Sequence, residues 1–377
     1  MQRVVILGGG VGGTIVANRL ARRLGPAEAV IILVDKDGRH VYQPGFMQVA
    51  FERKDPRRLE RGEWRLLNPR VHLILDEAVR IDPEAHEVRL AGGGAIRYDR
   101  LVLALGARLV PEELPGFAEA AHHFYTARAS RDLRGVLEAF RGGRIVVTVA
   151  SVPYKCPPAP AEAACQLDYY FTKRGIRDQV DIHFLSPISR VFPLEPINPA
   201  VDRLFAAHRI RSTVFFNVES IDPVAKVVRS IEGEEVPYDL LIMVPPHRGA
   251  KVVEDSGIGD RGGWLPVDRH TLRSKAHEEI FGLGDCTDLP VSKSGAAAHF
   301  QAKVVTENVI ADLRGKPAES RYDGRVMCYF DAGYHRAMAM VFDYEHAPEP
   351  REPGLRDWFG KRLLNHAYWT LVPTGRV

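Results

Sequence analysis

Two of the four cysteines stand in sequence contexts that favour redox chemistry. Cys156 lies among the prolines of the segment Y-K-C-P-P-A-P, which hold the backbone rigid, and Cys328 lies in a short apolar segment far along the chain. The thiolate is the reactive form of cysteine, and two thiols that meet in the fold can form and break a disulfide. Because the two residues do not form a C-x-x-C motif, an ordinary disulfide reductase with adjacent thiols is disfavoured.

The remaining cysteines and the lysine beside Cys156 need separate interpretations. Lys155 either lowers the pKa of the neighbouring thiol or is an ordinary solvated lysine. Cys165 lies on a predicted helix after the prolines, and Cys286 follows an aspartate, so we expect both to be small apolar core residues. The redox pair is therefore predicted to be Cys156 and Cys328.

The N-terminal segment predicts a dinucleotide-binding unit. Its expected elements are a strand at 3–7, a helix at 14–24 and a strand at 30–35. Gly8, Gly10 and Gly13 match the pattern G-x-G-x-x-G before the helix, and Asp35 ends the second strand. Glycines permit a tight turn and the approach of a pyrophosphate to the helix N-terminus, and the carboxylate can accept hydrogen bonds from ribose. A dinucleotide site is therefore favoured over a structural glycine turn.

Two later segments indicate which dinucleotide is bound. Residues 98–106 and 280–285 each have the pattern of a strand that ends in glycine, at Gly106 and Gly284. Both resemble signatures of flavoproteins with two dinucleotide domains, in which the aspartate of the second signature lies on the ribityl chain of FAD. The resemblance gives this role to Asp285, whose alternative role is a helix cap. The predicted cofactor is FAD.

A second α/β unit lies between these two segments. Its expected buried strands are 144–149, 180–185 and 238–244. A nicotinamide site is expected in such a unit, but no glycine fingerprint follows Val149, and Cys156 with its prolines stands there instead. Because ligands meet α/β folds at the carboxyl ends of the strands, we predict that the NAD(P) site is lost and that the cysteine takes its place.

The sequence thus predicts an α/β protein with two Rossmann-like domains and a small C-terminal module. The predicted divisions are 1–110 and 246–315 for the two parts of the FAD domain, 111–245 for the degenerate second domain and 316–377 for the C-terminal module. The module is expected to hold paired strands at 325–329 and 336–342 and an amphipathic helix. One face of that helix carries Leu355, Trp358, Phe359 and Leu363. Such a helix lies in a membrane interface, or packs on its own domain or in a dimer.

Several segments together resemble the sulfide:quinone oxidoreductase family, which is close kin of the flavoprotein subunit of flavocytochrome c sulfide dehydrogenase. The similar segments are residues 42–46, 154–162, 244–248, 293–295 and 327–329. The resemblance implies FAD-dependent transfer of electrons from sulfide to a membrane quinone, within the wider superfamily of pyridine nucleotide-disulfide oxidoreductases. It also implies a sulfur bridge at the flavin, with Cys156 as the persulfide carrier and Cys328 as the sulfur nearest the flavin.

Further residues near the predicted site have two interpretations each. Lys293 stabilises negative charge on reduced flavin or quinone, or is a plain surface lysine before a helix. His123 and Glu162 move protons near the sulfide, or are an exposed loop histidine and a first-turn helix glutamate. Many family members carry a third cysteine where residues 122–126 read H-H-F-Y-T, and no cysteine near Tyr42 can tether the flavin, so we expect non-covalent FAD.

Composition supports a folded protein and excludes other classes. The chain has 377 residues, 45% of them hydrophobic and 26% charged, with a formal net charge of +3, so disorder is excluded and nucleic acid is not an expected partner. The sequence has no secretory signal pattern and no apolar run long enough to span a bilayer. We therefore expect a peripheral protein on the cytoplasmic face of the membrane, a homo-oligomer, with no metal ligands.

Three alternatives to sulfide:quinone oxidoreduction remain open. A type II NADH:quinone dehydrogenase-like flavoprotein would share the fold, and bleaching of its flavin by NADH would identify it. A flavocytochrome c-type sulfide dehydrogenase would need an export route and a haem partner. A catalytically silent flavin-binding protein would bind the cofactor without turning over.

Overall fold

The computed structural model describes residues 1–376, so that Val377, the end of the predicted C-terminal module, lies outside the described residues. A parallel five-stranded sheet forms the first half, in the order β20-β9-β1-β2-β5. Its strands are β1 (Gln2–Leu7), β2 (Ala29–Asp35), β5 (Val71–Leu75), β9 (Arg100–Leu103) and β20 (Ile280–Gly282). Helix α1 (Val11–Arg23) connects β1 to β2 and begins directly after Gly10, three residues before the predicted start. Strand β20 returns to this sheet from the second half of the chain, as the predicted flavoprotein signature at 280–285 requires.

A second parallel five-stranded sheet has the order β11-β18-β12-β13-β14. Its strands are β11 (Ala121–His122), β12 (Gly143–Val149), β13 (Val180–Leu185), β14 (Ile210–Thr213) and β18 (Leu240–Val244). The helices of this half are α3 (Phe117–Ala120), α4 (Ala127–Ala139), α5 (Ala159–Lys173) and α6 (Asn198–Ala207). Two such sheets confirm the predicted tandem of Rossmann-like units.

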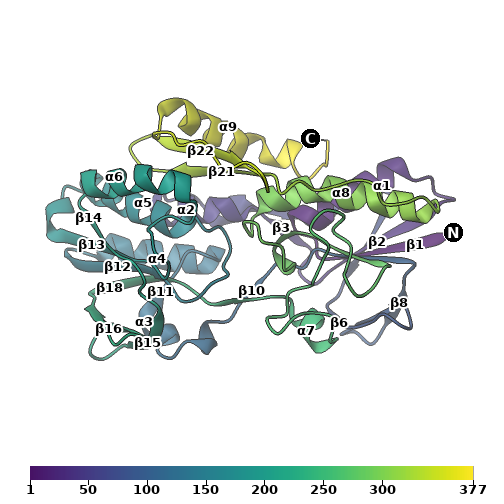
Figure 1. Cartoon of the computed structure of the whole chain (residues 1–377), viewed down its shortest axis with the longest axis horizontal. Helices are drawn as coiled ribbons and strands as arrows, with labels where there is room; N and C mark the ends of the chain where they lie inside the picture. The colour runs from purple at the N-terminus through teal and green to yellow at the C-terminus, as the bar shows by residue number, and fades with distance from the viewer. Residues whose placement is uncertain (377) are drawn as a thin grey trace.

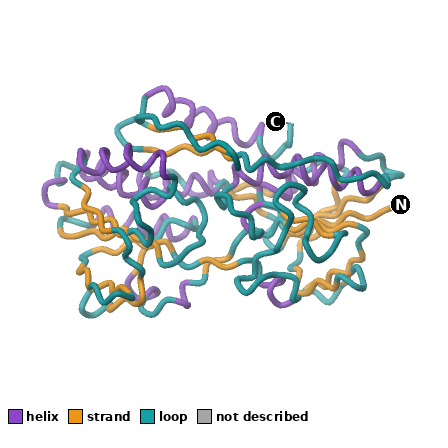
Figure 2. The backbone as a smooth tube through the Cα atoms, in the orientation of Figure 1, coloured by secondary structure: helices purple, strands orange, loops and turns teal. Residues whose placement is uncertain are grey.

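Each half also carries a small antiparallel sheet of three strands, on the side opposite its main helices (Figure 1). The strands are β6 (Ala78–Asp82), β7 (Glu87–Leu90) and β8 (Ala95–Arg97) in the first half, and β15 (Val218–Asp222), β16 (Val227–Ser230) and β17 (Glu235–Pro237) in the second. The first strand pair of both sheets has one register irregularity at the same relative place. Strands β10 (Arg108–Leu109) and β19 (His247–Arg248) pair between the halves, and Figure 2 shows them bridging the two groups of strands.

The C-terminal module covers the helical side of both halves (Figure 1). It consists of the hairpin β21 (Val326–Asp331) and β22 (Ala337–Phe342), followed by helix α9 (Leu355–Leu371). The long helix α8 (Gly295–Leu313) precedes it and packs against α1. Shorter elements are β3 (Arg39–Val41), β4 (Glu60–Gly62), α2 (Phe46–Phe51) and α7 (Lys251–Asp255). In the described part of the chain, every helix is too short or too polar to cross a bilayer.

Apolar burial is divided between the two main sheets. One cluster of buried side chains joins the first sheet to α1 and α8, and a second joins the other sheet to α5 and the hairpin. Cys286 lies in the first cluster and Cys165 in the second, both with 0% exposure, as predicted for core residues. Cys328 is only partly buried at the edge of the second cluster. Cys165 and Cys286 are therefore core residues, whereas Cys156 and Cys328 lie near a surface.

Candidate active site

The loop between β1 and α1 has a geometry that requires glycine. Gly8 has φ +100°, and a Cβ atom on Gly13 would lie 1.9 Å from the carbonyl oxygen of Gly8. A Cβ atom on Gly10 would meet nothing within 4 Å, so the helix N-terminus is open on that side. Tight packing at two glycines and open space at the third are what a pyrophosphate at a helix N-terminus needs.

Asp35 lies at the end of β2 beside this loop. Its carboxylate accepts hydrogen bonds from the backbone N–H groups of Gly9 at 2.7 Å, Asp37 at 3.0 Å and Gly38 at 2.7 Å. These bonds hold the carboxylate at the edge of the glycine loop. A carboxylate oxygen accepts more than one hydrogen bond, so Asp35 retains acceptor capacity for a ribose hydroxyl.

The two later glycines and their aspartate lie at the carboxyl ends of β9 and β20. Gly106 has φ +69° with open space around its Cα, and Gly284 has φ +74° and donates its N–H to the Gln301 Oε1 atom at 2.6 Å. Burial raises the pKa of Asp285, and the charges of Lys155 and Lys293 oppose that rise. The donor and acceptor groups of this edge, together with the open space at Gly10 and Gly106, fit an FAD molecule that extends from the glycine loop toward Asp285.

The loop that carries Cys156 joins β12 to α5. Cys156 has φ +52°, an uncommon conformation for a residue other than glycine. Its N–H donates to the Lys293 carbonyl oxygen at 2.8 Å, and its own carbonyl oxygen accepts from the Ala159 N–H at 2.9 Å. The first of these bonds ties the cysteine loop to the segment that follows Asp285, so residues from both halves meet here.

Cys328 lies on β21 and approaches the same place from the C-terminal module. Burial raises the pKa of its thiol to about 12, and a hydrogen bond with Ser294 opposes the rise. Ser294 is also the N-cap of α8, where its side chain accepts from the Ala297 N–H at 3.3 Å. The two thiols lie close enough that the charge of a Cys328 thiolate would raise the pKa of Cys156. Both are free thiols in this structure.

The surroundings of Cys156 disfavour its thiolate although the residue has exposed surface. Dense packing around the sulfur raises the pKa of the Cys156 thiol, and the charges of Cys328 and Glu162 add to the rise. Lys361 is the cation that acts in the opposite direction. One of the two interpretations of Lys155 from the sequence assigned this role to it.

Lys155 and Lys293 are both buried, so the interpretations of a solvated and of a plain surface lysine are wrong. Lys155 is 9% exposed and donates from its Nζ atom to Gln43 Oε1 at 3.1 Å. Lys293 is 8% exposed and donates to the carbonyl oxygens of Asp285 at 3.1 Å and Thr287 at 2.6 Å. Burial lowers the pKa of each lysine, and Asp285 opposes the change in both cases. Two cations therefore flank Asp285 in a partly desolvated site.

Lys361 on α9 forms a buried ion-pair network that sequence reasoning missed. Its Nζ atom lies 2.7 Å from Glu162 Oε1 and 3.3 Å from Asp331 Oδ2. Glu162 is in the first turn of α5, as expected, but is only 6% exposed, and burial raises its pKa. Carboxylates that surround Lys361 raise the pKa of its ammonium against the effect of burial. The sequence carried no signal for this network, because its members come from three separate elements.

Two histidines lie behind the cysteine loop. His123 is partly buried, so the interpretation of an exposed loop histidine is wrong, and burial lowers its pKa to about 4. His247, which the sequence did not single out, is 4% exposed. Its Nδ1 atom lies 2.7 Å from the Pro245 carbonyl oxygen, so Nδ1 carries the proton and donates it to this oxygen. Burial lowers the pKa of His247 to about 3. Both imidazoles are therefore neutral near pH 7.

Residues 2–304 match the family described as pyridine nucleotide-disulphide oxidoreductase. The chain is 29% identical over 356 residues to the mitochondrial sulfide:quinone oxidoreductase of Mus musculus, covering 92% of this chain and 79% of the relative. It is 28% identical over 396 residues to the corresponding protein of Dictyostelium discoideum, covering 100% of this chain and 87% of the relative.

Among solved structures, the sulfide:quinone oxidoreductase of the bacterium Aquifex aeolicus superposes with a TM-score of 0.88. The superposition covers 100% of this chain and 92% of that protein, with 24% sequence identity. At this identity the likeness establishes the fold, including the C-terminal module, which lies beyond the matched family region.

Proposed function

Because the chain belongs to the pyridine nucleotide-disulphide oxidoreductase family, we propose that it is an FAD-dependent sulfide:quinone oxidoreductase. The observation that carries the proposal is the meeting of Cys156 and Cys328 beside Asp285 and Lys293, in the place where a second glycine fingerprint would otherwise stand. Similarity to sulfide:quinone oxidoreductases over nearly the whole chain supports the choice of substrates.

In this proposal the first half holds the cofactor without a covalent bond. Gly8, Gly10 and Gly13 accommodate the pyrophosphate, Asp35 binds the ribose, and Asp285 binds the ribityl chain. Gly106 leaves room for the remainder of the cofactor, and the left-handed conformation of Gly284 turns the chain toward Asp285. FAD, when bound, supplies a carrier that takes two electrons from a thiolate and passes them to a quinone.

The cysteines act as a bridged, electrophilic pair. As free thiols they would be protonated near pH 7 and would be poor nucleophiles, since the pKa of Cys328 is about 12 and that of Cys156 is also raised. A sulfide ion therefore attacks the sulfur–sulfur bond. Cys156 keeps the incoming sulfur as a persulfide, and Cys328 leaves with the bonding electron pair as a thiolate. As this electron pair passes to the flavin carrier, the Cys328 sulfur bonds to the outer sulfur of the Cys156 persulfide, which releases its proton, so the bridge is restored with one more sulfur atom.

Charged groups of the chain manage the protons and the negative charge. Lys361 lies against Glu162 beside the Cys156 loop, so this pair can take the proton released as sulfide is oxidised. Lys293, fixed by two carbonyl oxygens next to Asp285, stabilises negative charge that develops nearby. His123, whose pKa burial lowers to about 4, stays neutral near pH 7 and adds no charge to the site.

The C-terminal module supplies the quinone side in this proposal. Leu355, Phe359 and Leu363 on α9 are exposed by 54%, 59% and 70%, while Tyr368 on the same helix is buried. Helix α9 thus packs on the protein by one face and presents apolar side chains on another, as an interfacial helix does. We propose that this face contacts the cytoplasmic surface of a membrane, where a homo-oligomer takes up quinone.

The proposal is tested by mixing the purified yellow protein with sulfide under anaerobic conditions in a stopped-flow spectrometer. We expect bleaching of the flavin band at about 450 nm and recovery after a soluble quinone is added. Cys156→Ser and Cys328→Ser should each abolish the bleaching, and Cys165→Ala, which changes a buried cysteine outside the site, should not. The proposal would be contradicted if sulfide left the flavin oxidised while NADH bleached it. That result would favour a type II NADH dehydrogenase.

A further inference from the structure

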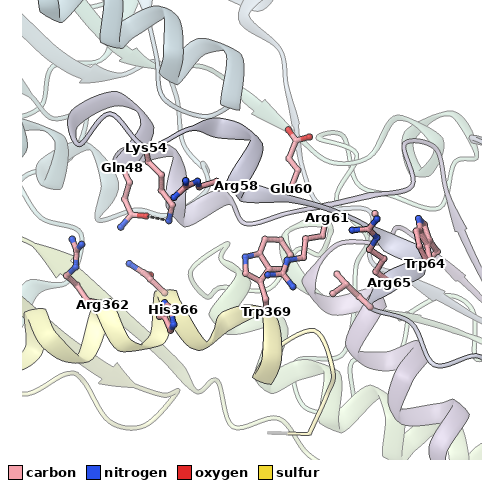
Figure 3. Close-up of a pocket in the computed structure, with 13 residues that line it drawn as sticks. Gln48, Lys54, Arg58, Glu60, Arg61, Trp64, Arg65, Arg362, His366 and Trp369 are labelled. Atoms are coloured by element: carbon pink, nitrogen blue, oxygen red, sulfur yellow. Dashed lines mark hydrogen bonds between the residues drawn. The ribbon is translucent and has the colours of Figure 1, made fainter.

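A groove of about 980 Å³ lies between α9 and residues 54–66 (Figure 3), and neither Cys156 nor Cys328 lines it. We call it the basic groove, because its lining includes the cationic side chains Lys54, Arg58, Arg61, Arg65 and Arg362, together with His366. Glu60 is the one carboxylate among the described lining residues, and it lies 3.4 Å from Arg39. The groove therefore concentrates positive charge on a chain whose net charge is only +3.

Most of this charge is not neutralised by the protein. In the described part of the chain, Arg58, Arg61 and Arg65 form no ion pair. Arg362 pairs with Glu52 at 3.2 Å. Burial lowers the pKa of the Lys54 ammonium, and the like charges of Arg362 and Arg58 contribute to the decrease. An anion bound among these side chains would relieve their mutual repulsion.

Two tryptophans hold the guanidinium groups in position. The guanidinium of Arg61 lies over the Trp369 ring at 4.7 Å from its centroid, and that of Arg65 lies over the Trp64 ring at 4.9 Å. Trp64 is 66% exposed, so it forms an open rim of the groove. A stacked guanidinium keeps its N–H edge free, and that edge matches the oxygens of a phosphate group.

The basic groove borders an exposed apolar stripe. Leu355, Phe359 and Leu363 follow one another at four-residue spacing on α9 and are all more than half exposed. Arg362 and His366 lie next to this stripe on the helix surface and face the groove (Figure 3). A free phosphate ion or a nucleic acid would use the cations but would leave the stripe without a partner. A molecule with an anionic head and an apolar tail would use both.

We propose that the basic groove binds the phosphate headgroup of an anionic phospholipid while the apolar stripe of α9 enters the acyl boundary of the same leaflet. This inference rests on the membrane contact in the proposed function and adds the lipid class that the protein recognises. Electrostatic attraction to anionic lipids and burial of apolar side chains act together in such contacts, so neither neutral vesicles nor soluble phosphate should replace the lipid.

The test is flotation of the FAD-loaded protein with vesicles of phosphatidylcholine alone, or of phosphatidylcholine mixed with an equal amount of phosphatidylglycerol. We expect binding to the mixed vesicles only, and loss of binding as salt is raised. The double variant Arg58→Gln/Arg65→Gln should bind the mixed vesicles roughly thirty-fold more weakly, from about 1 kcal/mol for each cation at an anionic surface. The matched control Arg89→Gln/Arg97→Gln removes two charges from the remote sheet of β7 and β8 and should bind like the parent protein.

Other outcomes would overturn the proposal. Equal binding of the protein to both vesicle types would show that the basic groove does not recognise an anionic headgroup. The same conclusion would follow if the double variant bound the mixed vesicles like its control. Binding of inorganic phosphate or of a single-stranded oligonucleotide that depends on Arg58 and Arg65, without binding to vesicles, would assign the groove to a soluble anion. Flavin bleaching by sulfide is measured in solution on the same samples, so failure of the lipid proposal and failure of the proposed activity are distinguishable.

Discussion

The two parallel sheets share the order of four strands, β9-β1-β2-β5 and β18-β12-β13-β14, but the loops after their central strands have opposite chemistry. In the first sheet, β1 leads into a glycine loop whose backbone is packed so closely at Gly8 and Gly13 that side chains are excluded there. In the second, β12 leads into a loop of prolines in which Cys156 projects from a strained backbone position. In the proposed function, the same edge of a repeated fold therefore binds the cofactor in one half and presents the reactive cysteine in the other.

This difference shows how the repeated fold can serve two tasks. A glycine loop offers backbone N–H groups to a phosphate, which requires the absence of side chains. The proline loop offers no such surface, and its one backbone bond to Lys293 fixes the cysteine relative to the first half. Helix α9 and the β21–β22 hairpin then cover both halves and add Cys328 and Lys361 to the second loop. Four predictions test how far the two loops differ.

The largest effect is expected for Gly13→Val in the glycine loop. Any Cβ atom at this position lies 1.9 Å from the Gly8 carbonyl oxygen, so the backbone must move and the phosphate-binding turn is lost. We expect colourless protein with at least about a hundred-fold loss of FAD affinity, because a displaced backbone removes several hydrogen bonds at once. The ratio of flavin to protein absorbance measures the outcome.

Gly135→Ala is the matched control for the glycine loop. It lies on α4 in the second half, and a Cβ atom there meets nothing within 4 Å. Since alanine favours a helix more than glycine does, this variant should keep its flavin and gain stability by about 0.5–1 kcal/mol. A yellow Gly13→Val protein would show that the first loop does not carry the cofactor.

A large effect is also expected for Lys361→Met at the second loop. Removal of the cation leaves Glu162 and Asp331 buried together, and breaking a buried pair in this way costs about 3–5 kcal/mol of folding stability. Urea unfolding of the holoprotein measures the loss. The neighbouring variant Arg362→Met breaks the exposed pair with Glu52 and the contact of Arg362 with the Trp358 ring, so its cost should be at most about 2 kcal/mol. Equal losses in both variants would mean that the buried network does not stabilise the second loop.

The parts of the site that the sequence predicted are those with fixed spacing along the chain. Gly8, Gly10, Gly13 and Asp35 stand within one βαβ unit, so their places follow from a local pattern. The return of β20 to the first sheet was also predictable, because its strand pattern ends in the expected glycine and aspartate. In both cases the signal lies within one short segment of the sequence, although β20 pairs with β9 only after the whole second half has intervened.

The parts that were missed depend on contacts between distant elements. Lys361, Glu162 and Asp331 come from α9, α5 and β21, and no spacing in the sequence relates them. The burial of Lys155 and Lys293 was not predictable either, because lysine is usually exposed and the contacts that bury both residues come from distant segments. The division of the chain at 110, 245 and 315 and the roles of the site residues stay predictions.

A smaller difference between the halves is expected on acidification. His183 on β13 is 7% exposed, and burial lowers its pKa to about 4. In the unfolded chain this histidine takes up a proton near its usual pKa of about 6.5, whereas in the folded chain it stays neutral down to about pH 4. The free energy of unfolding is therefore highest above about pH 6.5. It falls as the pH decreases toward 4, by up to about 3 kcal/mol. Hydrogen exchange at pH 5 and pH 7 should show earlier opening of the second sheet. His183→Gln should reduce this dependence, and His72→Gln, an exposed position on β5, should leave it unchanged.

The smallest effect is expected for Asp35→Asn, which keeps the shape of the first loop and changes its charge. The amide oxygen can still accept from one of the backbone N–H groups that hold Asp35, but its NH₂ group cannot accept from a ribose hydroxyl. Loss of one charge-assisted hydrogen bond should weaken FAD binding by about tenfold. Titration of the apoprotein with FAD measures the change, and Asp37→Asn, which removes a neighbouring exposed carboxylate, should bind FAD like the parent. If Asp35→Asn and Asp37→Asn bound FAD with equal affinity, Asp35 would not be a ribose ligand. The first loop would then lack the carboxylate that distinguishes it from the proline loop.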